Sequence, residues 1–163
     1  MKRTTMLRLG IALVGVSAMA AAWVSQHMYG MQPCPWCVLQ RAIFGALALV
    51  AVLSLPLAKW PGVRLALDFS GLALALSGVA AACWQHFKAA AQASCNLTLA
   101  DKIVSAFQLE TLWPAMFSAT ASCADAAVDL FGLPYEYWSL ALFALLAATW
   151  VGLIWMRRAQ SAS

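Results

Sequence analysis

Charged residues are scarce in this 163-residue chain, which has ten Lys or Arg and six Asp or Glu. The surface of a soluble domain of this size needs far more charge, so a soluble globular fold is excluded. The sequence also lacks internal repeats, a low-complexity tail and any sign of a second domain. Because 64% of its residues are hydrophobic, we expect a membrane protein with a single domain over residues 1–163.

Four apolar runs have the length of a membrane span, at about residues 9–28, 38–57, 65–84 and 139–155. A spanning helix needs roughly 20 such residues, so we predict an all-α membrane protein with a bundle of four transmembrane helices. Pro56 and Pro61 indicate a tight turn that makes the second and third helices antiparallel neighbours. The first run has one alternative reading, a cleavable signal peptide, because it follows basic residues and contains small ones.

Basic residues predict the orientation, because Lys and Arg favour the cytoplasmic side of short loops. With four spans, both termini are cytoplasmic, while a short loop at 29–36 and a long loop at 87–138 face outward. The long loop holds five of the six acidic residues. The net charge of +4 therefore reflects topology, and we expect no nucleic-acid partner. Seven of the ten basic residues then lie on the cytoplasmic side: Lys2, Arg3, Arg8, Lys59, Arg64, Arg157 and Arg158.

Four of the five cysteines fall in the two outward loops, whereas Cys83 lies alone in the third helix as a small packing residue. Outside the cytoplasm paired cysteines tend to form disulfides. One reading is two structural bridges, and a bridge from Cys95 to Cys123 would contribute roughly 3 to 4 kcal/mol. That reading explains Cys34 and Cys37 poorly, because a two-residue gap closes a small ring that restrains little chain. A redox role fits the Cys34-Pro35-Trp36-Cys37 motif better.

Arg41 follows Cys37 by one helical turn, and residues four apart share a helix face about 6 Å apart. A guanidinium beside the sulfur and the positive end of the helix dipole both favour the Cys37 thiolate. The other reading of Arg41 is an interfacial arginine that snorkels to water.

A zinc site and a thioredoxin fold are both disfavoured. The sequence has one CxxC motif, and Cys95 and Cys123 are 28 positions apart with no second close pair. No βαβ pattern surrounds the motif. We therefore expect no metal.

The motifs as a set resemble the bacterial disulfide bond formation protein B (DsbB) family, quinone-linked thiol oxidases of the inner membrane. The resemblance covers nearly the whole chain. It rests on the segment Gln32-Pro33-Cys34-Pro35-Trp36-Cys37 with Gln40-Arg41, on Cys95, and on Leu112-Trp113-Pro114, Phe117, Ser122-Cys123, Phe131-Gly132-Leu133 and Trp138-Ser139-Leu140.

The resemblance implies a relay through two disulfides. Cys95 and Cys123 would form the outer pair that accepts electrons from a periplasmic thiol oxidase of the DsbA type, with Cys95 carrying the mixed disulfide. The electrons would pass to Cys34, which exchanges with the loop cysteines, and to Cys37, which faces a membrane quinone. The two loops would then be periplasmic.

The resemblance also implies a quinone pocket, for ubiquinone or menaquinone, in which Arg41 stabilises the charge that develops on the quinone oxygen. Gln85 and His86 end the third helix, where family members can line this pocket, so His86 is a candidate quinone ligand. We expect Asp68 to pair with Arg64, one turn before it on the same helix.

The segment from Ala100 to Phe117 places apolar residues where a short amphipathic helix could lie on the membrane surface. The alternative for this segment is loop packing on the bundle.

Two other functions compete with the relay. A heavy-metal membrane transporter also places cysteine pairs at membrane helices, but Arg41 would lie where the cation has to bind. A protein like vitamin K epoxide reductase has its CxxC near the last helix, whereas here the motif precedes the second.

Overall fold

The computed structural model of the chain describes residues 2–89, 98–126, 128–130 and 132–161. Four long helices form its body: α1 (Lys2–Met28), α2 (Pro35–Leu53), α3 (Pro61–Trp84) and α7 (Tyr135–Ser161). Each is long and apolar enough to cross a membrane. The prediction of an all-α membrane protein with four spans is therefore confirmed.

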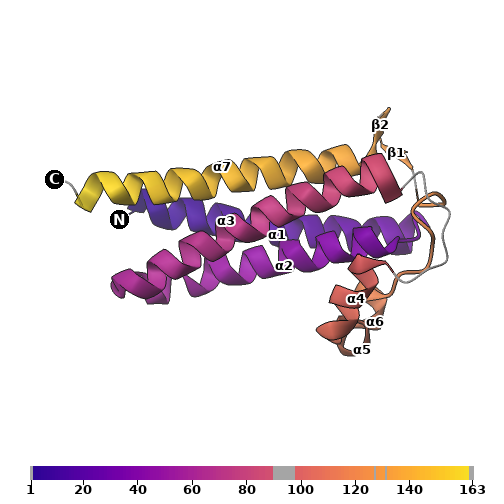
Figure 1. The fold of residues 1–163 in the computed structure, drawn as a ribbon, viewed down its shortest axis with the longest axis horizontal. Coiled ribbons are helices and arrows are strands. Elements are labelled where there is room, and N and C mark those ends of the chain that lie inside the picture. The colour runs from indigo at the N-terminus through magenta and orange to yellow at the C-terminus, as the bar shows by residue number, and fades with distance from the viewer. Residues whose placement is uncertain (1, 90–97, 127, 131, 162–163) are drawn as a thin grey trace.

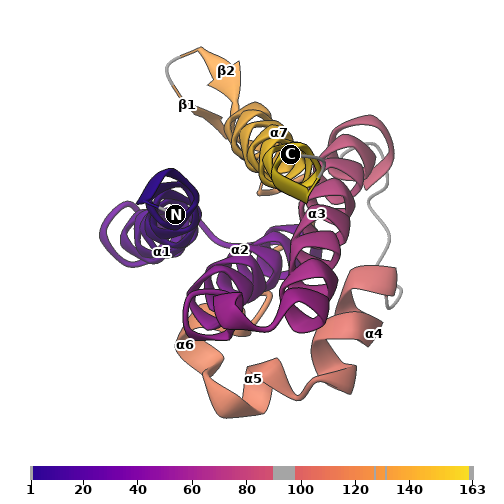
Figure 2. The same ribbon diagram turned by 90° about the vertical axis from the view of Figure 1, so that its left-hand side faces the viewer.

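Consecutive long helices run antiparallel around the bundle (Figure 1). α1 packs on α2, α2 on α3 and α3 on α7, and α7 returns to contact α1 (Figure 2). The two termini and the α2–α3 turn lie at one end, which we name the terminal end. The α1–α2 loop and the segment between α3 and α7 lie at the other, which we name the cysteine end because it carries Cys34 and Cys37.

Prolines determine where several helices begin and end. Pro35 and Pro61 occupy the first turns of α2 and α3, where a missing N–H costs nothing. α2 ends at Leu53, before the expected residue 57, because Pro56 cannot continue an α-helix and instead starts the 3₁₀ turn η1 (Pro56–Lys59). α7 begins directly after Pro134, earlier than the expected residue 139.

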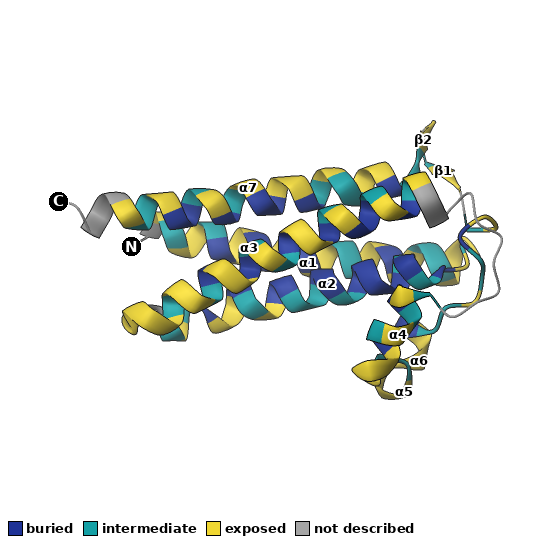
Figure 3. Cartoon of the chain, viewed as in Figure 1, coloured by how far each residue is buried: buried dark blue, intermediate teal, exposed yellow. Residues whose placement is uncertain are grey.

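The core lies along the facing sides of the four helices, as the burial pattern in Figure 3 shows. Large α7 side chains, Phe143 and Trp150, are fully buried against α3. They fit because α3 presents Gly78 and Gly71 opposite them, and a Cβ at either glycine would overlap the ring. Phe143 also stacks on Phe44 of α2 with ring centroids 4.0 Å apart.

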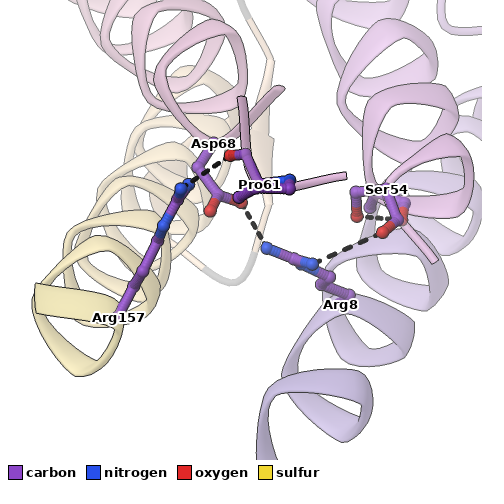
Figure 4. A network of polar contacts seen from close by, with 6 residues as sticks. Arg8, Ser54, Pro61, Asp68 and Arg157 are labelled. Carbon is purple, nitrogen blue, oxygen red and sulfur yellow. Dashed lines mark hydrogen bonds and ion pairs between the residues drawn. The ribbon is translucent and has the colours of Figure 1, made fainter. Parts of the chain in front are cut away.

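A polar network ties the helices together at the terminal end (Figure 4). Arg8 of α1 forms an ion pair with Asp68 of α3 and donates a hydrogen bond to the Ser54 carbonyl of α2, at 3.4 Å. Arg157 of α7 donates to the Pro61 carbonyl at 2.6 Å. The expected pairing of Asp68 with Arg64 is therefore wrong. Asp68 faces the bundle interior with 0% exposure, where an arginine from a neighbouring helix can meet it.

Three short helices lie beside α2 at the cysteine end: α4 (Leu99–Ala106), α5 (Leu109–Leu112) and α6 (Pro114–Phe117). Ala100 and Val104 of α4 are buried, whereas Leu99, Phe107 and Leu112 are well exposed. α4 thus packs one face on the bundle. Contact of the exposed apolar side chains with a membrane surface stays a prediction. The two-residue strands β1 (Asp129–Leu130) and β2 (Leu133–Pro134) pair as a hairpin before α7.

Candidate functional site

Cys34 and Cys37 lie together at the start of α2. Cys34 is the N-cap residue, and its sulfur accepts a hydrogen bond from the backbone N–H of Cys37 at 3.3 Å. The two sulfur atoms are 2.7 Å apart. Cys34 is fully buried, whereas Cys37 is partly exposed. The helix start therefore holds the pair in contact and places Cys37 in the first turn, where the helix dipole favours negative charge.

Cys123 lies near this pair, since its thiol and that of Cys34 interact and shift each other's pKa. The chain just before it is held against the α1–α2 loop, because the N–H groups of Thr120 and Ala121 donate to the Pro33 carbonyl at 3.0 and 3.3 Å. Three of the four predicted redox cysteines are thus in one place. The fourth, Cys95, lies outside the described residues.

The interaction between Cys34 and Cys123 shifts the pKa values of the two thiols in opposite directions. The hydrogen bonds of Cys34 to Cys123 and Cys37, together with burial, raise the pKa of Cys34. The hydrogen bond from Cys34 lowers the pKa of Cys123, although partial burial opposes it. Cys123 is therefore the thiol of this pair that ionises first, and a thiolate is the attacking species in disulfide exchange.

Arg41 is buried at 7% exposure, which disagrees with an interfacial arginine that snorkels to water. Its guanidinium donates to Gln26 Oε1 at 2.6 Å and to the carbonyls of Met116 and Ala22 at 3.0 and 3.3 Å. It interacts with the Cys37 sulfur electrostatically. Arg41 thus connects α1, α2 and α6 beside the CxxC pair.

The direct hydrogen-bond donor to Cys37 is Gln85, at 3.4 Å from its amide nitrogen to the sulfur. Gln40 donates to Gln85 Oε1 at 2.7 Å and so orients the amide. Gln85 opens the π-helical turn η2 (Gln85–Ala89) that follows α3. Sequence reasoning placed Gln85 near the pocket but missed this contact, because a π turn changes which side chains face inward.

His86 contacts two residues of α7, and its role as a quinone ligand stays a prediction. Its Nδ1 lies 3.0 Å from Glu136 Oε1, and its Nε2 lies 3.1 Å from the Tyr137 hydroxyl. Glu136 is almost buried and was not singled out from the sequence. A carboxylate two residues into an apolar helix is a signal that could have pointed to it.

Two cavities flank the CxxC pair. The smaller, of about 210 Å³, lies among α1, α2 and α7, and its lining includes Cys37, Arg41, Gln85 and Glu136. The larger, of about 1600 Å³, lies between the α2–α3 face and the short helices, and its lining includes Cys123. His86 lines neither. Within the described residues, no cluster of three or more His, Cys, Asp or Glu could hold a metal ion.

Comparison with known proteins decides the family. The family model described as Disulfide bond formation protein DsbB matches residues 3–153. The chain belongs to the DsbB family. Its relatives include Disulfide bond formation protein B of Herminiimonas arsenicoxydans, 28% identical over 90% of this chain and 92% of that protein. Disulfide bond formation protein B 1 of Pseudomonas putida is 32% identical over 84% of this chain and 82% of that protein.

Family membership makes the chain a multi-pass membrane oxidoreductase of disulfide bond formation. The heavy-metal transporter alternative is therefore set aside. The family model also covers the three described cysteines for which a redox role was predicted, together with Arg41 and His86. It leaves open what each of these residues does.

Proposed function

We propose that the chain reoxidises a periplasmic thiol oxidase of the DsbA type and passes the electrons to a membrane quinone, ubiquinone or menaquinone. The observation that carries this proposal is the position of Cys34 between Cys123 and Cys37. Cys123 lines the large cavity and Cys37 the small one. A cysteine that interacts with one thiol at each cavity suits a relay with one entry and one exit.

The entry step begins at the loop pair. In this proposal the reduced partner attacks Cys95 of a Cys95–Cys123 disulfide, which releases Cys123 as a thiolate. The released Cys123 thiolate then lies within interaction range of the Cys34 sulfur, and a thiolate is the attacking species in disulfide exchange. Attack of Cys123 on Cys34 then breaks the Cys34–Cys37 bond and forms a Cys34–Cys123 bond. The electron pair of the broken bond stays on Cys37.

Three features favour negative charge on the Cys37 sulfur. The Gln85 amide donates a hydrogen bond to it, the Arg41 guanidinium interacts with it electrostatically, and it lies in the first turn of α2. These groups are fixed by their own contacts to Gln40 and to α1, so they need little reorganisation as charge arrives.

The residues around the small cavity fit a quinone ring. Its walls include apolar side chains such as Phe44 and Leu142, and Arg41 and Gln85 supply N–H donors for a ring oxygen. When bound, a quinone supplies a two-electron acceptor. In our proposal Arg41 and Gln85 orient it against Cys37. Since Arg41 keeps its proton under all ordinary conditions, it acts through charge and hydrogen bonding alone.

Orientation in the membrane follows the basic residues. We propose that the terminal end faces the cytoplasm, since it gathers seven basic residues and one acidic residue, Asp68. The cysteine end then faces the periplasm of a bacterial inner membrane. There the partner can reach the loop cysteines while the small cavity stays within reach of quinone in the bilayer.

The test is quinone reduction by the detergent-purified chain supplied with a reduced DsbA-type protein. Cys37→Ser is expected to abolish reduction, because Cys37 is the one described thiol that lines the small cavity. The matched control is Cys83→Ser, since Cys83 lies within α3, lines neither cavity and should leave the rate unchanged. Quinone reduction that persists in Cys37→Ser would contradict the proposed exit.

A further inference from the structure

Three polar side chains form a continuous line from the surface at the cysteine end to the small cavity. Tyr137 is 41% exposed, the His86 side chain is 29% exposed and that of Glu136 is 9% exposed. The Tyr137 hydroxyl lies 3.1 Å from His86 Nε2, and His86 Nδ1 lies 3.0 Å from Glu136 Oε1. Glu136 alone of the three lines the cavity.

With a neutral imidazole beside an ionised carboxylate, the hydrogen bonds in this line have one direction. An ionised carboxylate can only accept, so the proton on the imidazole has to be on Nδ1. In a neutral imidazole Nε2 is then an acceptor, and the Tyr137 hydroxyl has to donate to it. Every hydrogen bond in the line therefore points inward, from the surface toward the cavity.

We propose that Tyr137, His86 and Glu136 form a proton path that supplies the small cavity from the outer surface. This inference rests on the proposed quinone chemistry of that cavity. As negative charge arrives from Cys37, the His86 Nδ1–H bond breaks and the proton moves to the Glu136 carboxylate. The Tyr137 O–H bond breaks as its proton moves to His86 Nε2. Bulk water restores the tyrosine, and exchange of the imidazole protons with water restores the Nδ1-protonated form before the second transfer.

Protons and electrons balance across one turnover. The partner's second thiol displaces Cys95, and Cys95 attacks Cys123 and releases Cys34, which re-forms the Cys95–Cys123 bond. Cys34 and Cys37 then give a pair of electrons as their own disulfide re-forms, and the protons of the partner's dithiol are released to the solution at the cysteine end. The path returns the same number of protons to the acceptor's oxygens through the Glu136 O–H bond. No net proton is consumed, and no further oxidant or reductant is needed.

The other ionisable groups at the cavity are poorly suited to this task. Arg41 does not release its proton, and Cys37 supplies electrons. The Tyr135 side chain is engaged with Ser25 of α1. Glu136 is thus the described carboxyl group that both lines the cavity and continues to the surface through hydrogen bonds.

The experiment compares wild type with Glu136→Gln in the purified full chain, with a reduced DsbA-type protein and a short-chain ubiquinone. Glutamine keeps an oxygen that accepts from His86 Nδ1, so the link between η2 and α7 is retained, but it cannot pass a proton. We expect a loss of about 10²-fold in the rate of quinone reduction, the range of general acid catalysis. Quinone affinity, measured by tryptophan fluorescence quenching, should stay unchanged.

His27→Gln is the matched control, since His27 is exposed and bonded to the Trp23 carbonyl of its own helix. It should reduce quinone at the wild-type rate. The chain has two histidines, so the same variant leaves His86 as the one imidazole signal in a ¹⁵N-histidine NMR spectrum. That spectrum should show the Nδ1-protonated tautomer.

Three results would overturn the proton path. They are a wild-type rate in Glu136→Gln, a loss of rate matched by an equal loss of quinone affinity, and the Nε2-protonated tautomer of His86 in the control variant. A wild-type chain that reduces no quinone at all overturns the proposed function itself, and the proton path with it. The two failures are therefore distinguishable.

Discussion

The Arg8–Asp68 ion pair at the terminal end should be essential to stability, and Asp68→Asn isolates its charge. Asparagine keeps the shape and one acceptor oxygen but leaves the guanidinium without a counter-ion. Arg8 is 2% and Asp68 0% exposed, so water cannot replace the carboxylate. Two further arginines, Arg64 and Arg157, interact with Arg8 electrostatically and would repel it once the carboxylate is neutral.

Breaking a buried pair by removing one partner costs about 3 to 5 kcal/mol, and the nearby arginines favour the upper part of that range for Asp68→Asn. The assay is the free energy of unfolding from SDS titration in mixed micelles. Asp129→Asn, at an exposed position, is the control and should change stability by less than about 0.5 kcal/mol.

A double variant, Arg8→Met with Asp68→Leu, distinguishes the pair from its parts. Replacing both charges with apolar side chains of similar size is often neutral or stabilising, so the double variant should recover most of the stability lost in Asp68→Asn. If the free energy of unfolding of Asp68→Asn is within about 0.5 kcal/mol of the wild-type value, the reasoning about this buried charge is refuted.

Three further outcomes are expected. Gly78→Ala should cost about 1 to 3 kcal/mol of unfolding free energy by overpacking against α7, whereas Gly152→Ala, with open space at its Cβ, should be neutral or stabilising in the same SDS titration. Cys34→Ala removes the interaction that lowers the pKa of Cys123, so the pKa of Cys123 should rise. The alkylation rate of Cys123, followed by peptide mass spectrometry, should then reach its midpoint at a higher pH, and an unchanged midpoint would contradict this cause. Gln85→Leu removes the amide donor to the Cys37 sulfur and should slow quinone reduction at least about tenfold; a wild-type rate would contradict that role.

The sequence predicted the four spans because length and hydropathy alone decide whether a helix can cross a membrane. Helix ends were predicted less well. α2 stops at Leu53, since the effect of Pro56 reaches back to the residues before it, while a hydropathy run continues through Leu57. The ion pair between helices could not be predicted from the sequence either. Arg64 is one turn from Asp68 in sequence, but the partner is Arg8 of another helix.

At the site, the CxxC motif and its arginine were predictable because they share one short stretch of sequence. The contacts to Cys37 from Gln85 and to Cys34 from Cys123 were not, because they depend on how α3 ends and on how the loop docks on Pro33. Glu136 was missed for the same reason, since its place at the cavity depends on where α7 begins.

The central claim is the order Cys123, Cys34, Cys37, and disulfide mapping tests it most directly. The oxidised, quinone-depleted chain is mixed with a reduced DsbA-type protein, trapped with acid, alkylated and mapped by mass spectrometry. The account predicts a Cys34–Cys123 bond with Cys37 as the free thiol, because the Cys123 and Cys34 thiols interact. An intact Cys34–Cys37 bond beside a reduced Cys123, or a bond between Cys123 and Cys37, would contradict it.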